Sequence, residues 1–165
     1  MRIPVRFRLF AFVVGAALVA SVRAAESPAP FALKGGDRVM FLGDALAEGE
    51  QRHGWIEVML TTRFADQDIT FRNLGWNGDT PAGDARAGLS LLQAGHEPAD
   101  EGWKQLTLQL GQMKPTVVFV AYGMASSFAG ADGVPRFQSD YRRLLDTVEK
   151  TSPGARLVLV GPIRH

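Results

Sequence analysis

The sequence predicts an α/β fold with three layers, in which helices cover both faces of a parallel β-sheet. Short apolar runs that suit buried strands alternate with segments whose apolar residues recur at helical spacing. The order is strand, helix, strand, helix, strand, helix, strand, and right-handed crossovers then place the helices on the faces of the sheet. A chain of 165 residues, 46% of them hydrophobic, suits one domain with one core.

Four segments have the character of strands. The first, 39–42, ends at a Gly-Asp pair that favours a turn. The third, 116–122, is β-branched and unbroken, which is typical of a strand buried on both faces. The expected strands are 39–42, 69–74, 116–122 and 157–160.

Three segments between these strands carry an apolar stripe at helical spacing. Pro115 ends the second segment, and Pro153 followed by Gly154 closes the third. The stripes consist of Ile56, Met59, Leu60 and Phe64, then Trp103, Leu106, Leu110 and Met113, then Phe137, Tyr141, Leu144, Leu145 and Val148.

The first 24 residues have the pattern of a signal peptide. Arginines precede an apolar stretch at 9–22, and the small-x-small sequence Val22-Arg23-Ala24 suits signal peptidase. An uncleaved membrane anchor is the alternative, but the stretch is shorter than the roughly 20 residues that span a bilayer. We expect a signal peptide at 1–24, a lead-in segment at 25–36 and a domain at 37–165. The protein is then periplasmic or extracellular, with no stable membrane insertion after cleavage.

Composition excludes several classes of function. Four of the 18 basic residues precede Glu26, and 17 acidic residues outnumber the other 14, so the domain lacks the basic surface that binds nucleic acid. The absence of cysteine excludes disulfides, thiolate metal sites and a cysteine nucleophile.

The loops after the first three strands carry three short motifs, at the strand ends where such sheets bind ligands. They read Gly43-Asp44-Ala45-Leu46, then NLGWNGDT at 73–80, then YGMAS at 122–126. In order and context they resemble the first three blocks of the SGNH/GDSL hydrolases, which are G-D-S, N-x-x-x-x-G-D-T and G-x-N-D. The resemblance runs from Asp37 to the end of the chain and implies the flavodoxin-like SGNH hydrolase fold. A generic doubly wound domain with chance matches is the alternative.

The resemblance implies a serine that attacks an acyl or acetyl ester, and a late D-x-x-H block whose histidine is the base. Position by position, Ala45 stands at the nucleophile. The oxyanion-hole positions are Ala45, Gly78 and Ala125. The other site-lining residues are Asp44, Asn73 and Ser126.

This chain departs from the family pattern in three places. Ala45 replaces the serine, Ala125 replaces the third-block asparagine with Ser126 beside it, and the chain ends at His165 without a D-x-x-H block. Loss of a serine nucleophile costs about 10⁶ in kcat, and loss of one oxyanion donor costs about 10²–10³. Because the chain ends directly after the fourth strand, we expect an SGNH domain that is incomplete at its C-terminus, with this strand on an open edge of the sheet. A truncated gene, an incomplete sequence or a longer parent protein would each explain such a fragment.

The resemblance and these departures from it predict two alternative functions. The first is an ester hydrolase by descent, acting on acyl or acetyl esters, including carbohydrate-linked ones, and catalytically impaired in this chain. The second is an exported pseudoenzyme that binds a carbohydrate or acyl ligand without turnover. The expected partner is therefore a small-molecule or carbohydrate ester.

A substitute triad is the weaker hypothesis. Ser126 or Ser127 would need a base within hydrogen-bond reach. His53, expected near the start of the first helix, is more typical of a surface residue; His96 lies in a polar linker, and His165 does not match the family's late block.

No cofactor or metal is expected. The histidines are scattered, Asp44 and Asp79 each follow a glycine and suit turns, and no dinucleotide-binding glycine motif follows a strand. Trp76 either stacks on a sugar ring or packs over its own helix.

Overall fold

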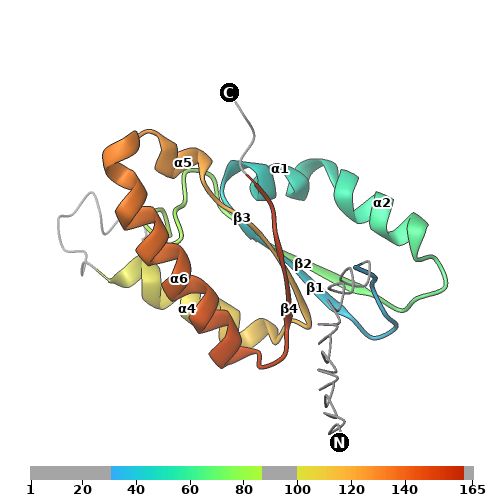
Figure 1. Cartoon of the computed structure of the whole chain (residues 1–165). Helices are drawn as coiled ribbons and strands as arrows, with labels where there is room; N and C mark the ends of the chain where they lie inside the picture. The colour runs from blue at the N-terminus through green and yellow to red at the C-terminus, as the bar shows by residue number, and fades with distance from the viewer. Residues whose placement is uncertain (1–30, 87–99, 162–165) are drawn as a thin grey trace, which may run out of the picture. The chain divides into compact units, whose positions relative to one another are not determined.

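A computed structural model describes residues 31–86 and 100–161 of the chain. Its sheet has the strand order β2-β1-β3-β4, and each neighbouring pair is parallel (Figure 1). The predicted α/β class is therefore confirmed. The strands are β1 (Arg38–Gly43), β2 (Thr70–Gly75), β3 (Val117–Ala121) and β4 (Arg156–Leu159).

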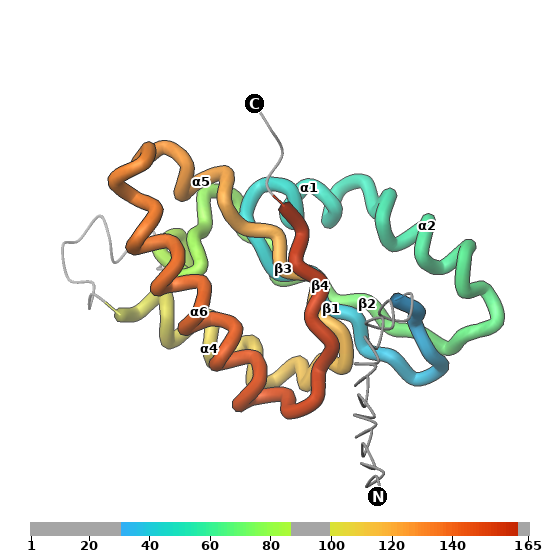
Figure 2. The backbone as a smooth tube through the Cα atoms, viewed as in Figure 1, coloured from blue at the N-terminus to red at the C-terminus, as the bar shows by residue number. Residues whose placement is uncertain are grey.

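The helices form a layer on each face of this sheet, as Figures 1 and 2 show. Two of them, α4 and α6, cover one face, and α1 and α2 lie on the other. The helices are α1 (Ala45–His53), α2 (Trp55–Arg63), α4 (Glu101–Met113), α5 (Met124–Ser127) and α6 (Val134–Thr151), with a 3₁₀ turn, η1 (Ala131–Gly133), before α6.

The main core lies between the sheet and the pair α4 and α6. These helices form because their apolar residues recur every three or four positions, and the stripes predicted from the sequence are the faces that become buried. Burying one such aliphatic side chain stabilises the fold by about 1.5–3 kcal/mol. The fully buried aliphatic members are Met40, Leu42, Val118 and Val120 from the sheet and Leu106, Leu110, Leu144 and Val148 from the helices.

A smaller core lies on the other face. Phe41 is at its centre, with the ring of Phe71 stacked 6.1 Å away and the ring of Phe119 tilted at 5.4 Å. Ile56 and Leu60 of α2 cover this cluster and are only partly buried. Since α2 buries no residue fully, this layer is less tightly packed than the layer of α4 and α6.

The first helical region differs from its prediction. The apolar stripe from Ile56 predicted one helix, but a second helix, α1, begins directly after β1, and the two are separated by Gly54 in the left-handed conformation with φ 63°. Helix α1 has few apolar residues and was therefore missed. The predicted position of His53 near the start of a helix was wrong for the same reason, because His53 is the last residue of α1.

Strand β4 is at one edge of the sheet and β2 is at the other, so the predicted edge position of the fourth strand is confirmed. Leu157 and Leu159 pair with Val118 and Val120 and are 38% and 57% exposed. Within the described ranges, no helix has the length and apolarity needed to cross a bilayer. The signal peptide predicted at 1–24 lies outside the described residues.

Candidate functional site

The three loops that carry the family motifs leave the sheet at one level. Gly43, the last residue of β1, is in register with Gly75 at the end of β2 and with Ala121 at the end of β3. These strands are adjacent, so their loops start side by side at the carboxyl edge of the sheet, where ligands bind in this architecture.

The side chain of Asp44 joins the first loop to the third. Its Oδ2 atom accepts hydrogen bonds from the backbone N–H groups of Gly123 at 3.1 Å, Met124 at 2.9 Å and Ala125 at 3.4 Å. The residue is only 3% exposed. A buried carboxylate needs such donors, and these are the free N–H groups at the start of α5. Asp44 is therefore a bridge between two loops.

Ala45 is the first residue of α1 and is half-buried. The helix begins here because the carbonyl of Asp44 accepts from Glu48 N–H at 2.9 Å. The N–H groups at the start of a helix are free to face an anion. The predicted nucleophile position therefore lies at a strand-to-helix turn, where Ala45 has a methyl group and no hydroxyl.

Asn73 has a structural role in this chain. Its amide nitrogen donates to the carbonyl of Ala47 at 2.7 Å, and its oxygen accepts from the N–H of Gly75 at 2.7 Å. Gln51 adds a donor to the same oxygen at 3.4 Å and to the Gly75 carbonyl at 2.8 Å. Asn73 thus fastens α1 to the end of β2, and its amide is occupied by the protein itself.

Two glycines allow this close packing. A Cβ on Gly75 would lie 2.3 Å from backbone atoms of Ala47 and Glu48 in α1, and one on Gly43 would lie 2.2 Å from the Ala121 carbonyl oxygen. Any larger residue would push the helix or the neighbouring strand away.

Gly78 lies in the exposed part of the second loop, with φ 74°. The loop is held to the first one because the N–H of Trp76 donates to the carbonyl of Gly43 at 3.0 Å. It then turns tightly, since Asp79 N–H donates to the Trp76 carbonyl at 3.0 Å. A glycine suits the positive φ of this turn.

Asp79 is completely buried and forms an ion pair that was not predicted. Its Oδ2 accepts from Arg86 Nε at 2.8 Å and from the hydroxyl of Tyr122 at 3.1 Å, and its Oδ1 accepts from Ala85 N–H at 3.3 Å. Arg86 also donates to the Leu74 carbonyl at 2.6 Å and to Gln109 at 2.8 Å. This network fixes the second loop against β2, β3 and α4.

The pKa values in this network follow its burial. Burial raises the pKa of Asp79, although the Arg86 charge and the donated hydrogen bonds act in the opposite direction. Burial, followed by the Asp79 charge, moves the pKa of Tyr122 well above its usual range, so its hydroxyl keeps its proton and donates it. The family motif singled out Asp79, but neither Arg86 nor Tyr122 carried any signal that they meet it.

Ala125 and Ser126 line a hollow of about 160 Å³ between the third and second loops. Thr80 and Pro81, which follow Gly78 closely, form its opposite wall, and Phe137 of α6 closes it. The structure therefore brings the second and third motif loops around one small cavity. Asp44 attaches the turn that carries Ala45 to the same third loop.

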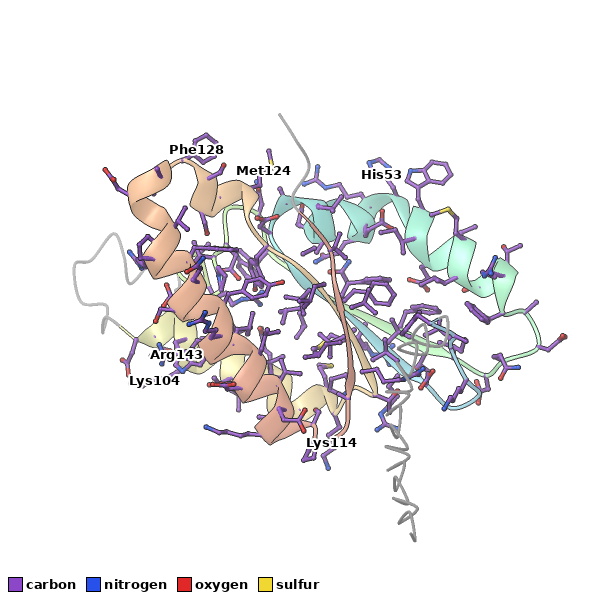
Figure 3. All side chains as sticks on the ribbon, in the orientation of Figure 1. His53, Lys104, Lys114, Met124, Phe128 and Arg143 are labelled. Atoms are coloured by element: carbon purple, nitrogen blue, oxygen red, sulfur yellow. The ribbon has the colours of Figure 1, made fainter. Side chains whose placement is uncertain are left out.

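The proposed substitutes for the triad lie in different places. The hydroxyl of Ser127 donates to the Met124 carbonyl at 2.6 Å. His53 is exposed at the end of α1 and lines a separate hollow with Glu57 and Thr61. In Figure 3 it lies on the side of α1 and α2, whereas Met124 and Phe128 lie over α5. His96 and His165 lie outside the described residues.

Asp44 and Asp79 do not form a shared site, since each has its own set of protein donors. Across residues 31–86 and 100–161, no group of three or more His, Asp or Glu side chains is arranged to hold a metal ion.

The sequence matches no protein-family model and no curated protein. Among solved structures, it is similar to the psychrotrophic esterase EstA from Pseudoalteromonas sp., with 22% identity and a TM-score of 0.52 over 77% of this chain and 61% of the esterase chain. The acetyl xylan esterase AlAXEase matches with 15% identity and a TM-score of 0.47 over 74% of this chain and 56% of its own. Axe2, an acetylxylan esterase from Geobacillus stearothermophilus, matches with 16% identity and a TM-score of 0.44 over 76% and 59%.

The likeness to EstA concerns the fold, and this chain spans about three fifths of the length of that structure. The predicted fold is therefore confirmed: the chain shares the parallel-sheet α/β architecture of that structure.

Proposed function

We propose that this chain is an exported protein with an esterase fold that binds an ester or carbohydrate ligand at the carboxyl edge of its sheet without hydrolysing it. The fold supports descent from an ester hydrolase. The side chains at the candidate site favour binding over turnover.

The main support is the bridge from Asp44 to the N–H groups of residues 123–125, beside an alanine. This bridge holds the first and third loops together as a catalytic site requires. Ala45, however, offers only a methyl group next to it. Removing the nucleophile from a serine hydrolase lowers kcat by about 10⁶, so a well-formed scaffold with alanine here predicts binding without acyl transfer.

A second departure from the family pattern, at Ala125, also lowers the expected rate of hydrolysis. An oxyanion hole needs donors aimed at the developing negative charge, and each donor is worth about 10²–10³ in rate. Gly78 and Ala45 still provide backbone N–H groups, but Ala125 has no side-chain donor. The absence of this side-chain donor weakens the stabilisation of a tetrahedral intermediate.

Hydrolysis of p-nitrophenyl acetate tests this proposal. The unaltered chain should show no rate above the buffer blank and no covalent labelling by a fluorophosphonate. The Ala45→Ser variant restores a hydroxyl at the start of α1, and fluorophosphonate labelling of that serine would identify the position as the lost nucleophile. Ala65→Ser, on the exposed turn between α2 and β2, is the matched control.

Turnover by the unaltered chain would overturn the proposal. The decisive result would be a rate above the blank together with labelling, both abolished by Ser126→Ala. That combination would mean that Ser126 has taken over as nucleophile.

A further inference from the structure

We infer that the hollow beside Trp76, at the β2 edge of the sheet, is a binding subsite for a neutral saccharide. The inference rests on the proposed function, because it names the ligand class that the site would hold. It adds a location, since this hollow is lined by the first part of the second motif loop, from Asn73 to Asn77, and not by Ala45, Gly78 or Ala125.

The hollow has a volume of about 460 Å³ and lies beside β2, the edge strand of the sheet within the described residues. Pockets for small ligands typically have about 300–1,000 Å³. Its walls come from both sides of the sheet, with α1 on one side and α4 on the other. The side chains that matter are Glu48 and Gln51 of α1, Trp76 and Asn77 of the second loop, and Arg86 and Gln109.

Two amides in this wall are held in place by protein hydrogen bonds. Gln51 uses its nitrogen to donate to the Gly75 carbonyl at 2.8 Å, which leaves its oxygen to accept. Gln109 uses its oxygen to accept from Arg86 at 2.8 Å, which leaves its nitrogen to donate. A hydroxyl both donates and accepts. The wall therefore offers one fixed acceptor and one fixed donor, which suits adjacent hydroxyls of a sugar.

Trp76 supplies the apolar part of the hollow. Although it is a large aromatic residue, it is 47% exposed. The guanidinium of Arg86, itself fixed by Asp79, lies 5.8 Å from the centre of its ring and restrains its orientation. An indole with an exposed surface next to polar groups matches a ligand that has both C–H surface and hydroxyls. A pyranose ring has both.

The charges around the hollow favour a neutral ligand. Arg86 is paired with the buried Asp79 at 2.8 Å. Glu48 is paired with Arg52 at 3.1 Å. Among the described residues that line the hollow, each charged group therefore has a partner of opposite sign, and these residues leave no excess charge to attract a phosphate or a carboxylate. A neutral saccharide is compatible with this balance.

Calorimetric titration of the 165-residue chain with cellotetraose and xylotetraose tests the subsite. We expect saturable binding of at least one of them, weakened about tenfold or more by Trp76→Ala, since that ratio is the loss of about 1.4 kcal/mol of contact energy. Trp55→Ala is the matched control, because Trp55 is 67% exposed on α2 and does not line the hollow. It should leave affinity within about twofold. Circular dichroism checks that each variant is folded.

Asn77→Ala is the second variant, chosen because Asn77 lies on the exposed surface of the loop and lines the hollow. It should weaken the same titration while the fold is retained. Absence of binding of both oligosaccharides at millimolar concentration would overturn the subsite, and so would equal affinities for Trp76→Ala and Trp55→Ala.

The two proposals fail separately. Hydrolysis of p-nitrophenyl acetate by the unaltered chain would end the pseudoenzyme proposal and leave the titration to decide the subsite. Absence of saccharide binding would end the subsite and leave the loss of the nucleophile unaffected.

Discussion

Arg86 donates from Nε to Oδ2 of Asp79 across 2.8 Å, and both side chains are almost completely buried. This pair attaches the second motif loop to the body of the domain, because Arg86 also reaches the Leu74 carbonyl in β2 and Gln109 in α4. A buried ion pair therefore stabilises the conformation of the loop that carries Gly78 and Trp76.

Removing one member of this pair should be costly. Arg86→Ala leaves the Asp79 carboxylate buried without its counter-ion, and breaking a buried pair in this way destabilises proteins by about 3–5 kcal/mol. Arg136→Ala removes an exposed arginine that pairs with Asp84 and Asp140, and such pairs are worth about 0–1 kcal/mol. Urea denaturation of both variants measures the difference. Equal midpoints would contradict the assigned role of Arg86.

Gly75 should not tolerate a side chain. Gly75→Ala places a methyl group 2.3 Å from the backbone of α1, and overpacking of this kind costs about 1–3 kcal/mol. Gly49→Ala is the matched control: Gly49 lies within α1 with no atom within 4 Å of an added Cβ. This change should stabilise the helix by about 0.5–1 kcal/mol. Thermal unfolding checks whether the two changes have opposite signs.

Asp44 should protect the third loop from solvent. Asp44→Ala removes the acceptor of three backbone N–H groups, and unsatisfied buried donors cost about 1–3 kcal/mol. We expect faster amide hydrogen exchange at residues 123–125. Asp44→Asn keeps one acceptor oxygen and should have a smaller effect. Asp132→Ala, at an exposed position of η1, should leave this exchange unchanged. An identical exchange pattern in all three variants would exclude the bridge.

The parts of the fold that depend on periodicity could be predicted from the sequence. Strands β1 and β3 are nearly continuous apolar runs, and the stripes of α4 and α6 recur at helical spacing, so burial alone determines their structure. Helix α1 could not be predicted in this way. It lies near the edge of the sheet and buries only Ala47, so its sequence carries no clear stripe.

The motif positions could be located from the sequence, but the functions of their side chains could not. The loops after β1, β2 and β3 were expected to meet, since parallel strands end at one edge. Asn73 fastens α1, and Asp79 pairs with Arg86. Both contacts depend on which side chains come together when the chain folds. Local spacing contains no information on such meetings, and a buried ion pair between residues seven apart in a loop has no sequence signature.

At the opposite end of the sheet, Asp37 should make stability depend on pH. Burial by itself would raise its pKa, but hydrogen bonds from the Lys34 N–H at 2.7 Å, from Arg156 and from Thr116 at 2.8 Å outweigh burial and lower the pKa below its ordinary value of 3.8. A carboxylate with a lowered pKa in the folded state stabilises the fold above the ordinary value, and this contribution is lost as the pH falls through the folded-state pKa. The unaltered chain should therefore lose stability below about pH 4.

Asp37→Asn should be less stable at neutral pH and lose less on acidification, as urea denaturation at several pH values can measure. Asp66→Asn, at an exposed turn, controls for the change in net charge. If Asp37→Asn and Asp66→Asn lose stability equally between about pH 5 and about pH 3, then Asp37 does not join the starts of β1, β3 and β4 in the way that its contacts indicate.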